Sequence, residues 1–371
     1  MKLTCNREKL ASAFGTAASV APGRSPKAIL QNVKLEASSD AVTLIATDLE
    51  IGIRIELPDV EIETPGSVVL PVKRFGEIVR ESSDEKLHIK SDGQSLTVWG
   101  QHSEFKLPMQ NPDEFPNVTD FHEEKYHEVP AKLLREMIRR TVFATDMEST
   151  RYALGGVLWE MSADKILAVG TDGRRLAKME GPAIAVGGHE TGDNPVIVPS
   201  RAMQLIERAL SDADVEVRVA CRSNQMLVKT PRVTVCATLV AGRFPKWREV
   251  FPDESGAKQI DLLAGPFNAA VRQAAIVTSE ESRGVDFTFG EGELLLTARA
   301  AEAGESRVEM PISYSGEKIP ITLDPGYLSE FLRILEPEKS LRLAITNAEG
   351  AVVLNTDDGY SYVIMPLARE K

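Results

Sequence analysis

Residues 166–177 read ILAVGTDGRRLA, and this stretch sets the pattern for the rest of the chain. Small and apolar residues alternate up to Thr171, as they do in a β-strand. Asp172-Gly173 then predicts a tight turn, because both residue types tolerate the backbone conformations that turns require. A second strand begins at Arg174, so the stretch is expected to form a β-hairpin.

Two other stretches are similar to this hairpin. Residues 42–53 read VTLIATDLEIGI, and residues 293–300 read ELLLTARA. Their threonines and that of the first stretch, Thr47, Thr171 and Thr297, recur at intervals of 124 and 126 residues. In a chain of 371 residues, this spacing predicts three copies of one domain of common size.

Each expected repeat contains two units in which a short strand leads into an amphipathic helix. The helices are predicted at 6–19, 72–82, 131–143, 201–210, 266–277 and 326–335, with Asn6 as the N-cap of the first. Alternating strands follow each second helix, so the predicted fold is α+β, with two helices packed on antiparallel sheets in each repeat. Domains are expected at 1–122, 127–253 and 258–371, with polar linkers near 118–126 and 252–258.

The composition is that of a water-soluble globular protein, with 43% hydrophobic and 26% charged residues. No apolar run is long enough for a membrane span, so no membrane partner is expected. The three cysteines are too few and too scattered for a disulfide framework or a CxxC metal site.

Charge is sorted between the helices and the rest of the chain. The six predicted helices carry thirteen Lys or Arg and six Glu, a balance of +7, whereas the whole chain carries −12. Helices favour Lys and Arg for their own sake, but six helices without a net acidic member favour a shared polyanionic partner. The sequence contains no base-reading motif, so contact with nucleic acid would be to phosphates.

Helix geometry limits how such a protein could surround DNA. Helices packed side by side lie about 10 Å apart, so a ring of six leaves a hole of only about 9 Å. That hole is narrower than the roughly 12 Å major groove of a duplex. Twelve helices leave a hole of about 28 Å, so two chains could encircle a duplex and one could not.

Nine motifs in order along the chain resemble the bacterial DNA sliding clamp, the beta subunit of DNA polymerase III. They are MKLTCNREKL (1–10), PGRSPKAILQNV (22–33), TDLE (47–50), PVKRF (71–75), RYALGG (151–156), TDGRRLA (171–177), VPSR (198–201), GRFPKWREVFP (242–252) and YVIMPL (362–367). The resemblance implies a head-to-tail homodimeric ring of six domains that encircles double-stranded DNA and tethers the replicative polymerase. It also implies a bacterial, cytoplasmic and nucleoid-associated processivity factor that catalyses no reaction and needs no cofactor or metal.

The resemblance also implies three sets of functional residues. A pocket for short peptides of the DNA polymerase III catalytic subunit, clamp-loader subunits and other clamp-motif proteins would comprise Leu154, Thr171, Gly173, Arg174, Arg175, Leu176, Pro245, Val250, Tyr327, Val363, Met365, Pro366 and Leu367. DNA contacts would come from Arg24, Lys73, Arg80, Ser149, Arg151, Tyr152 and Arg201. The dimer interface would comprise Arg74, Phe105, Leu107, Ile276 and Val277.

Four features depart from the family pattern. Ala153 stands where an aromatic residue is familiar, Glu249 where a basic one is, and Ala368 where many clamps are basic, while the end of the chain is longer than in the shortest members. These departures affect the expected peptide preference and one loop contact rather than the fold.

Two other functions are compatible with parts of the sequence. Asp48 and Asp172 could be imagined as metal ligands of a phosphodiesterase, although equivalent turns in separate repeats explain both better. A repeat-built scaffold that binds only proteins would keep the pocket but would have no use for basic helices. Histidines form no HExxH motif, and neither a Walker loop nor GxGxxG is present.

Overall fold

The computed structural model describes residues 1–371 except 147, 149–152, 193, 211–214, 280–282 and 369–371. The chain forms two compact units. Unit 1 comprises Met1–Leu134, Ala183–Glu190 and Arg201–Leu239, and unit 2 comprises Arg135–Pro182, Thr191–Ser200 and Val240–Lys371. The middle of the chain therefore contributes to both units.

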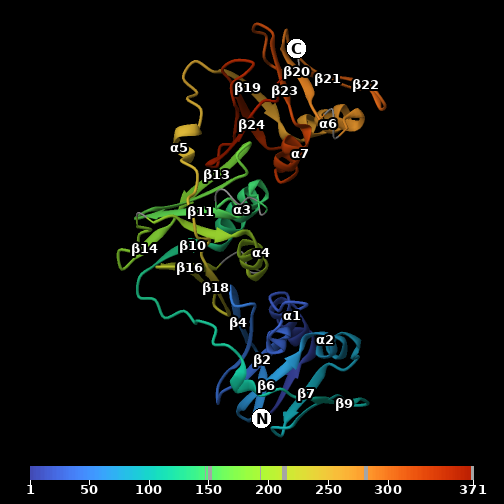
Figure 1. Ribbon diagram of the computed structural model, residues 1–371, viewed down its shortest axis with the longest axis vertical. Helices are drawn as coiled ribbons and strands as arrows, with labels where there is room; N and C mark the ends of the chain where they lie inside the picture. The colour runs from blue at the N-terminus through green and yellow to red at the C-terminus, as the bar shows by residue number, and fades with distance from the viewer. Residues whose placement is uncertain (147, 149–152, 193, 211–214, 280–282, 369–371) are drawn as a thin grey trace. The chain divides into compact units, whose positions relative to one another are not determined.

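A similar order of strands and helices occurs three times along the chain, with one described strand fewer in the third copy (Figure 1). The first copy is β1 (Lys2–Asn6), α1 (Arg7–Ala18), β2 (Asn32–Ala37), β3 (Val42–Thr47), β4 (Ile51–Leu57), β5 (Val60–Thr64), β6 (Gly66–Pro71), α2 (Val72–Glu81), β7 (Lys86–Ser91), β8 (Ser95–Trp99) and β9 (Glu104–Pro108). The second is β10 (Tyr126–Pro130), α3 (Ala131–Thr141), β11 (Gly156–Ser162), β12 (Lys165–Thr171), β13 (Arg175–Pro182), β14 (Ile184–Val186), β15 (Val196–Pro199), α4 (Ser200–Ala209), β16 (Glu216–Arg222), β17 (Gln225–Lys229) and β18 (Val233–Thr238). The third follows a short helix, α5 (Trp247–Val250), and is β19 (Lys258–Leu263), α6 (Ala264–Ala274), β20 (Val285–Gly290), β21 (Glu293–Ala300), β22 (Gly304–Pro311), β23 (Ile319–Leu323), α7 (Pro325–Arg333), β24 (Ser340–Ile345), β25 (Val352–Asn355) and β26 (Tyr360–Ile364).

The third copy differs from the first two in its hairpin and in one missing strand. The hairpin expected at 293–300 is wrong in position, because Glu293–Ala300 is the single strand β21 and the turn lies at 301–303. Pairing with β22 continues to Ala300 opposite Gly304, so Thr297 lies inside the strand rather than before a turn. Among the described residues, the third copy also has no counterpart of β5 and β14.

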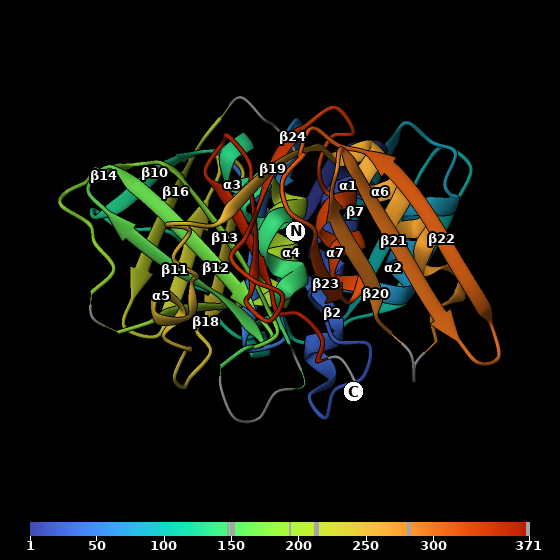
Figure 2. The same cartoon turned by 90° about the horizontal axis from the view of Figure 1, so that it is seen from above.

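All strand pairs in the described chain are antiparallel, and the sheets join neighbouring repeats. Unit 1 holds a sheet in the order β5-β1-β7-β8-β9 and a nine-stranded sheet, β14-β10-β16-β17-β18-β4-β3-β2-β6. Unit 2 holds an eight-stranded sheet, β15-β11-β12-β13-β26-β25-β24-β19, and a four-stranded one, β22-β21-β20-β23, whose long strands run side by side in Figure 2. The pairs β4–β18 and β13–β26 thus make the joints between repeats.

The helices pack in pairs, α1 with α2 and α6 with α7. The predicted N-cap of α1 is confirmed, since Asn6 Oδ1 accepts the backbone N–H of Lys9 at 3.1 Å. Leu10 and Phe14 are buried on one face of α1, and the rings of Phe14 and Phe75 of α2 lie 4.8 Å apart. Each such buried aromatic or leucine side chain stabilises the fold by about 1.5–3 kcal/mol. The predicted α+β class of helices on antiparallel sheets is confirmed.

The segments between repeats have no regular secondary structure, as the polar stretches predict, but the first is not a free linker. Val118 is only 3% exposed and packs with Phe115, Leu227 and Cys236 in the core of unit 1. No helix within the described ranges is both long and apolar enough to cross a bilayer.

Candidate functional site

The turn between β12 and β13 is held by side chains of its own residues. Asp172 Oδ1 accepts the backbone N–H groups of Arg174 (2.9 Å) and Arg175 (3.0 Å). Thr171 Oγ1 donates to the carbonyl of Arg175 and accepts the N–H of Gly173, whose φ of 89° is in the left-handed region. The turn therefore sends two consecutive arginines in different directions, Arg174 to solvent and Arg175 into the protein.

Arg175 is saturated with protein partners. Its guanidinium binds Asp172 through Nε (3.0 Å), the carbonyl of Phe143 through Nη2 (2.9 Å), and Glu330 of α7 through Nη1. It also lies over the ring of Tyr327, 4.5 Å from the centroid, and is 8% exposed. Each of the three guanidinium nitrogens has a protein partner, so Arg175 holds the turn against α7.

This turn borders a cavity of about 720 Å³ that lies entirely within unit 2. Ten of the thirteen residues predicted for a peptide pocket line it, namely Leu154, Thr171, Gly173, Arg174, Arg175, Leu176, Pro245, Val250, Val363 and Met365. Val250 is 64% exposed and Met365 48% exposed, although both are large and apolar. Exposed apolar side chains around a concave surface are typical of a binding site.

Three predicted pocket residues do not line the cavity. Tyr327 lies under the Arg175 guanidinium, as described above. The N–H of Leu367 donates to the carbonyl of Thr322 at 2.8 Å, which ties the segment that includes Pro366 to β23. These residues border other parts of unit 2.

The cavity also has five lining residues outside the predicted pocket set, of which the sequence places only Glu249 at the pocket edge. They are Arg243, Lys246, Glu249, Pro252 and Ala351. The first four belong to the motif GRFPKWREVFP, so treating that motif as one continuous wall would have found them. Ala351 lies between β24 and β25, and its sequence offers no signal.

The unusual residues near the pocket have ordinary local explanations. Ala153 is 6% exposed and packs with Phe244 and Trp247 in one apolar cluster. Glu249 is exposed and pairs with Lys246 at 2.6 Å, one helical turn away. Ala368 is exposed.

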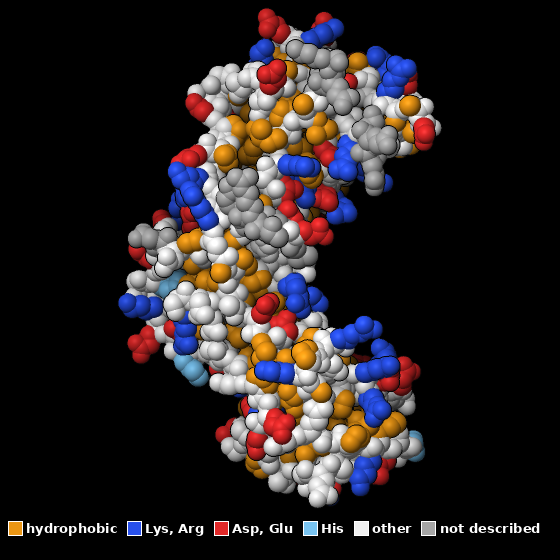
Figure 3. All heavy atoms as spheres, viewed as in Figure 1, with side chains coloured by type: hydrophobic (Ala, Val, Ile, Leu, Met, Phe, Trp, Pro, Cys, Tyr) orange, Lys and Arg blue, Asp and Glu red, His pale blue; other side chains and the backbone are white. Residues whose placement is uncertain are grey.

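The predicted DNA contacts within the described ranges lie in unit 1. Arg24, Lys73, Arg80 and Arg201 are exposed, and Arg201 Nη1 is 3.1 Å from Asp48 Oδ2. Figure 3 shows Lys and Arg side chains along the side of unit 1 that carries α1 and α2. The predicted contacts Ser149, Arg151 and Tyr152 lie outside the described residues.

The helix charge count includes one arginine that is not available to a polyanion. Arg140 of α3 is 9% exposed, its Nη1 is 2.9 Å from Asp358 Oδ2, and its guanidinium lies over the ring of Tyr360. Arg140 is therefore counted in the helix charge but adds nothing to the exposed basic surface; it holds α3 against the hairpin of β25 and β26.

Four of the five predicted dimer residues lie at or beside two sheet edges, and the fifth, Arg74, is on a helix. Phe105 (39% exposed) and Leu107 are on β9, the last strand of the five-stranded sheet, and Arg74 is exposed on α2. Ile276 (78% exposed) and Val277 follow α6 in a short 3-10 helix that packs on β21 and β22. Strand β22 is the last strand of the four-stranded sheet.

The two aspartates considered as phosphodiesterase ligands are both committed to turns. Asp48 Oδ1 accepts the N–H groups of Glu50 (3.0 Å) and Ile51 (2.8 Å), as Asp172 does in its own turn. Within the part of the chain that the structure describes, no group of three or more His, Cys, Asp or Glu is arranged to hold a metal ion.

Three repeats of helices on antiparallel sheets, with neighbouring repeats joined strand to strand, define a protein with the DNA clamp fold. Models of the N-terminal, central and C-terminal domains of the DNA polymerase III beta subunit match residues 1–119, 128–246 and 248–368. The chain belongs to this family of DNA polymerase III beta subunits, the sliding clamps of DNA replication.

Named relatives and solved structures resemble the chain along its whole length. It is 31% identical over 375 residues to a beta sliding clamp of Caulobacter vibrioides, with 99% of this chain and 100% of the relative covered. It is 28% identical to that of Escherichia coli strain K12, with the same coverage. The crystal structure of the DNA polymerase III subunit beta from Pseudomonas aeruginosa matches with a TM-score of 0.91 and 26% identity over 100% of both chains.

Proposed function

We propose that two copies of this chain close head to tail into a ring around double-stranded DNA. The observation that carries the proposal is the pattern of sheet joints. Strand β4 is the edge strand of the first repeat and pairs with β18, the last strand of the second repeat. In the same way, β13 of the second repeat pairs with β26, the last strand of the third. The remaining strands in equivalent positions are β22 of the third repeat and β9 of the first. Pairing them between two chains closes the ring with six domains, at 1–122, 127–253 and 258–371 of each chain.

The apolar side chains beside these two strands support the same interface. Ile276 and Val277 follow α6 next to β22, whereas Phe105 and Leu107 are on β9. Burying them between chains would remove exposed apolar surface, and Arg74 would lie at the rim.

DNA passes through the ring in this proposal, and the helices contact its phosphates. Arg24, Lys73, Arg80 and Arg201, together with Ser149, Arg151 and Tyr152, are the proposed contacts. Because phosphates are identical along a duplex, binding has no sequence preference and weakens with salt. The ring itself performs no catalysis and needs no cofactor; it acts in the bacterial cytoplasm with the nucleoid.

The cavity in unit 2 is proposed to hold a short peptide of a partner protein. Its exposed Val250 and Met365 and its buried Leu176 and Val363 supply an apolar surface for one or two large side chains. The proposed partners are the catalytic subunit of DNA polymerase III, clamp-loader subunits and other proteins with a clamp-binding motif. Tyr327, Pro366 and Leu367 would then contact the peptide beyond the cavity.

The ring is tested by mass and by topology. Sedimentation at low concentration should give twice the chain mass of 40.6 kDa, and Phe105→Glu should shift it toward the monomer. The loaded protein should remain on circular duplex DNA and leave the same DNA after it is cut, because a ring slides off free ends. Equal retention on both forms would identify a groove-binding protein, and a stable monomer would contradict ring closure.

A further inference from the structure

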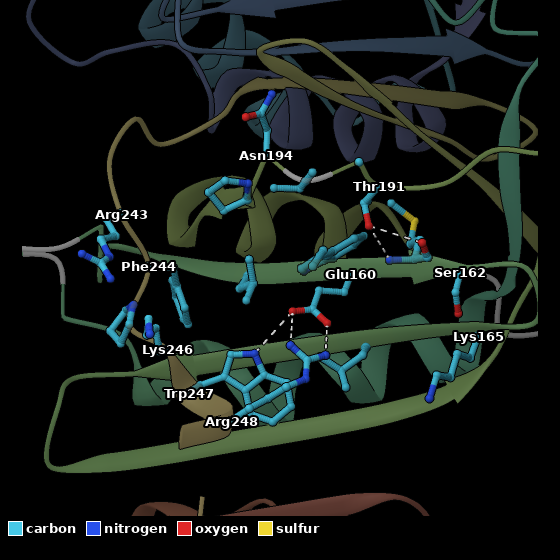
Figure 4. A pocket seen from close by; sticks show the side chains of 18 of the residues that line it. Glu160, Ser162, Lys165, Thr191, Asn194, Arg243, Phe244, Lys246, Trp247 and Arg248 are labelled. Carbon is cyan, nitrogen blue, oxygen red and sulfur yellow. Dashed lines mark hydrogen bonds and ion pairs between the residues drawn. The ribbon is translucent and has the colours of Figure 1, made fainter. Parts of the chain in front are cut away.

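A second cavity adjoins the peptide pocket within unit 2. It measures about 660 Å³ and is lined by β11, β12, residues 191, 192 and 194–196, and the segment at 243–249. We call it the side cavity (Figure 4). Four residues, Arg243, Pro245, Lys246 and Glu249, line both cavities. A chain that leaves the peptide pocket across this shared segment therefore enters the side cavity.

The floor of the side cavity is apolar and shares its packing with the peptide pocket. Leu158, Leu167 and Trp247 line it, and each is at most 8% exposed. They belong to the same apolar cluster as Leu176 and Val363 of the peptide pocket. The two cavities are thus neighbouring depressions over one rigid core.

One wall of the side cavity is formed by a bidentate ion pair between Glu160 and Arg248. Glu160 Oε1 accepts from Arg248 Nη1 at 2.9 Å and from Trp247 Nε1 at 3.4 Å, while Arg248 Nη2 binds the other oxygen. The hydrogen bonds from Arg248 lower the pKa of Glu160 although partial burial opposes them. Arg248 also lies over the Trp247 ring, 4.2 Å from its centroid. These groups are committed to each other and form structure rather than a recognition site.

The other cations of the side cavity, Lys165, Arg243 and Lys246, are exposed to solvent. Within the described chain, the exposed guanidinium of Arg243 contacts no carboxylate. Lys246 meets only the exposed Glu249, and Lys165 lies 3.9 Å from Glu180. In Figure 4, Arg243 and Lys246 lie toward one end of the cavity and Lys165 toward the other.

The charge of the lining is opposite to that of the chain. Lys165, Arg243, Lys246 and Arg248 exceed Glu160 and Glu249 by two positive charges, on a protein of net charge −12. Basic lining on an acidic surface attracts an acidic segment and repels a basic one.

We propose that the side cavity binds an acidic segment that flanks the apolar anchor of a partner peptide. This inference rests on the proposed role of the neighbouring pocket and names the partner's chemistry. The anchor occupies the peptide pocket, the backbone crosses the segment at 243–249, and Asp or Glu side chains of the flank approach Arg243, Lys246 and Lys165. The flank contributes affinity and selects among partners that share the same anchor.

The probes are five synthetic peptides with one anchor, a Leu-Phe pair between Gly and Ser residues. One peptide is the anchor alone; two carry three Glu residues at the amino or the carboxyl end, and two carry three Lys residues there. Their affinities for the full-length protein are measured by fluorescence anisotropy at 50 and 300 mM salt. We expect one acidic peptide to bind about tenfold more tightly than the anchor alone at low salt, since each exposed ion pair contributes roughly two- to fivefold. The gain shrinks at high salt.

Three variants locate the flank. Lys165→Glu changes a residue of the side cavity that does not line the peptide pocket, so it should remove part of the acidic gain and leave the anchor peptide unchanged. Arg243→Glu should remove more, because Arg243 lies where the two cavities meet. Arg232→Glu is the matched control, an exposed arginine in a turn of unit 1, and should change nothing.

The outcomes separate this inference from the proposed function. If the anchor peptide binds but neither acidic extension improves it, or if lysine extensions improve it equally, the acidic flank is wrong and the peptide pocket stands. An acidic gain that Lys165→Glu and Arg232→Glu reduce equally reflects general attraction and also overturns the proposal. If the anchor peptide itself does not bind, the peptide pocket fails first.

Discussion

The turn between β3 and β4 in unit 1 and the turn between β12 and β13 in unit 2 are copies of one local structure with different surroundings. In each, the first oxygen of an aspartate, Asp48 or Asp172, accepts two backbone N–H groups. A threonine before it donates to the carbonyl that begins the next strand, at 2.8 Å from Thr47 and 2.6 Å from Thr171. The Thr and Asp side chains therefore make the same hydrogen bonds in both turns.

The difference lies in the second aspartate oxygen and in the residue that follows. Asp172 Oδ2 binds the buried Arg175 of its own turn, whereas Asp48 Oδ2 binds Arg201, whose side chain is 58% exposed. The positive φ belongs to Gly173 in unit 2 but to Leu49 in unit 1. The same backbone has thus become a pocket wall in one place and an exposed charged surface in the other.

The largest expected effect is the loss of the buried arginine. Arg175→Met keeps an apolar stem but leaves Asp172 and Glu330 without their partner, so the free energy of unfolding should fall by about 3 kcal/mol. Arg201→Met removes a mostly exposed pair and should cost at most about 1 kcal/mol. Urea unfolding followed by circular dichroism measures both, and equal losses would show that the two turns depend on their arginines alike.

A smaller effect is expected from exchanging the residues with positive φ. Gly173→Leu should destabilise the protein by about 1–2 kcal/mol, because a side chain is strained at a φ of 89°. A Cβ atom at Gly173 would meet no other atom within 4 Å, so the cost is one of backbone conformation. Leu49→Gly should be neutral or stabilising by less than about 1 kcal/mol, since glycine removes strain but gains freedom in the unfolded chain. Thermal unfolding of both variants checks the signs, and a stabilising Gly173→Leu would refute the argument.

Acid should affect unit 1 before unit 2, because His189, whose pKa is shifted by folding, lies in unit 1. Burial, and then the neighbouring His127, lower the pKa of His189 from its ordinary value of 6.5. The unfolded chain therefore takes up the proton first, so the stability that is present above pH 6.5 declines as the pH falls toward the lower folded pKa. In unit 2, the pKa of Asp358 falls to about 2 despite partial burial, chiefly through hydrogen bonds from Thr356 and Arg140, so its contribution is lost only below the ordinary carboxyl value of 3.8.

The measurement compares unfolding midpoints at pH 7.5 and 5.5. The free energy of unfolding that is lost between pH 7.5 and 5.5 should stay below about 1 kcal/mol. His189→Gln should reduce this pH dependence, because glutamine does not titrate. The fold should be kept, since the amide oxygen can still accept the N–H of Cys221, which is 3.1 Å from His189 Nε2. His122→Gln changes an exposed histidine and serves as the control. An unaltered pH dependence in His189→Gln would assign it to other groups.

The smallest effect is expected from the exposed pair Lys246 and Glu249, which lines the proposed peptide pocket. Glu249→Gln breaks the contact with Lys246 and should change the free energy of unfolding by less than about 0.5 kcal/mol. The urea midpoint should stay close to that of the unaltered protein. A large loss would mean that this pair, like Arg175, belongs to the structure of the pocket.

The sequence predicted the repeat and its elements well where a local signal exists. Thr-Asp before a turn located two hairpins, and an N-cap at Asn6 located the start of α1. The third hairpin was misplaced because the Thr-Asp pair is absent there. Strand β21 instead stays paired with β22 up to Ala300. Burial of Val118 could not be predicted, since a single apolar residue in a polar stretch does not reveal what it packs against.

The candidate pocket was predicted from motifs, which identify the residues involved but not the contacts that each side chain makes. Motif residues near the turn at Asp172 line the cavity, whereas Tyr327 does not line it and packs against the Arg175 guanidinium. Arg175 itself was assigned to recognition, and only its three hydrogen-bond partners show that it is occupied. The burial of Arg140 could not be predicted either, because a charge count does not distinguish a solvated arginine from one in an ion pair.

The strand joints at β4–β18 and β13–β26 have a consequence for truncation. Cutting the chain at a repeat boundary would strip a neighbour from β4 or β13 and leave a row of unpaired backbone donors and acceptors. Isolated single repeats should therefore aggregate more readily than the intact chain, and cooperative unfolding should follow the two units rather than the three repeats.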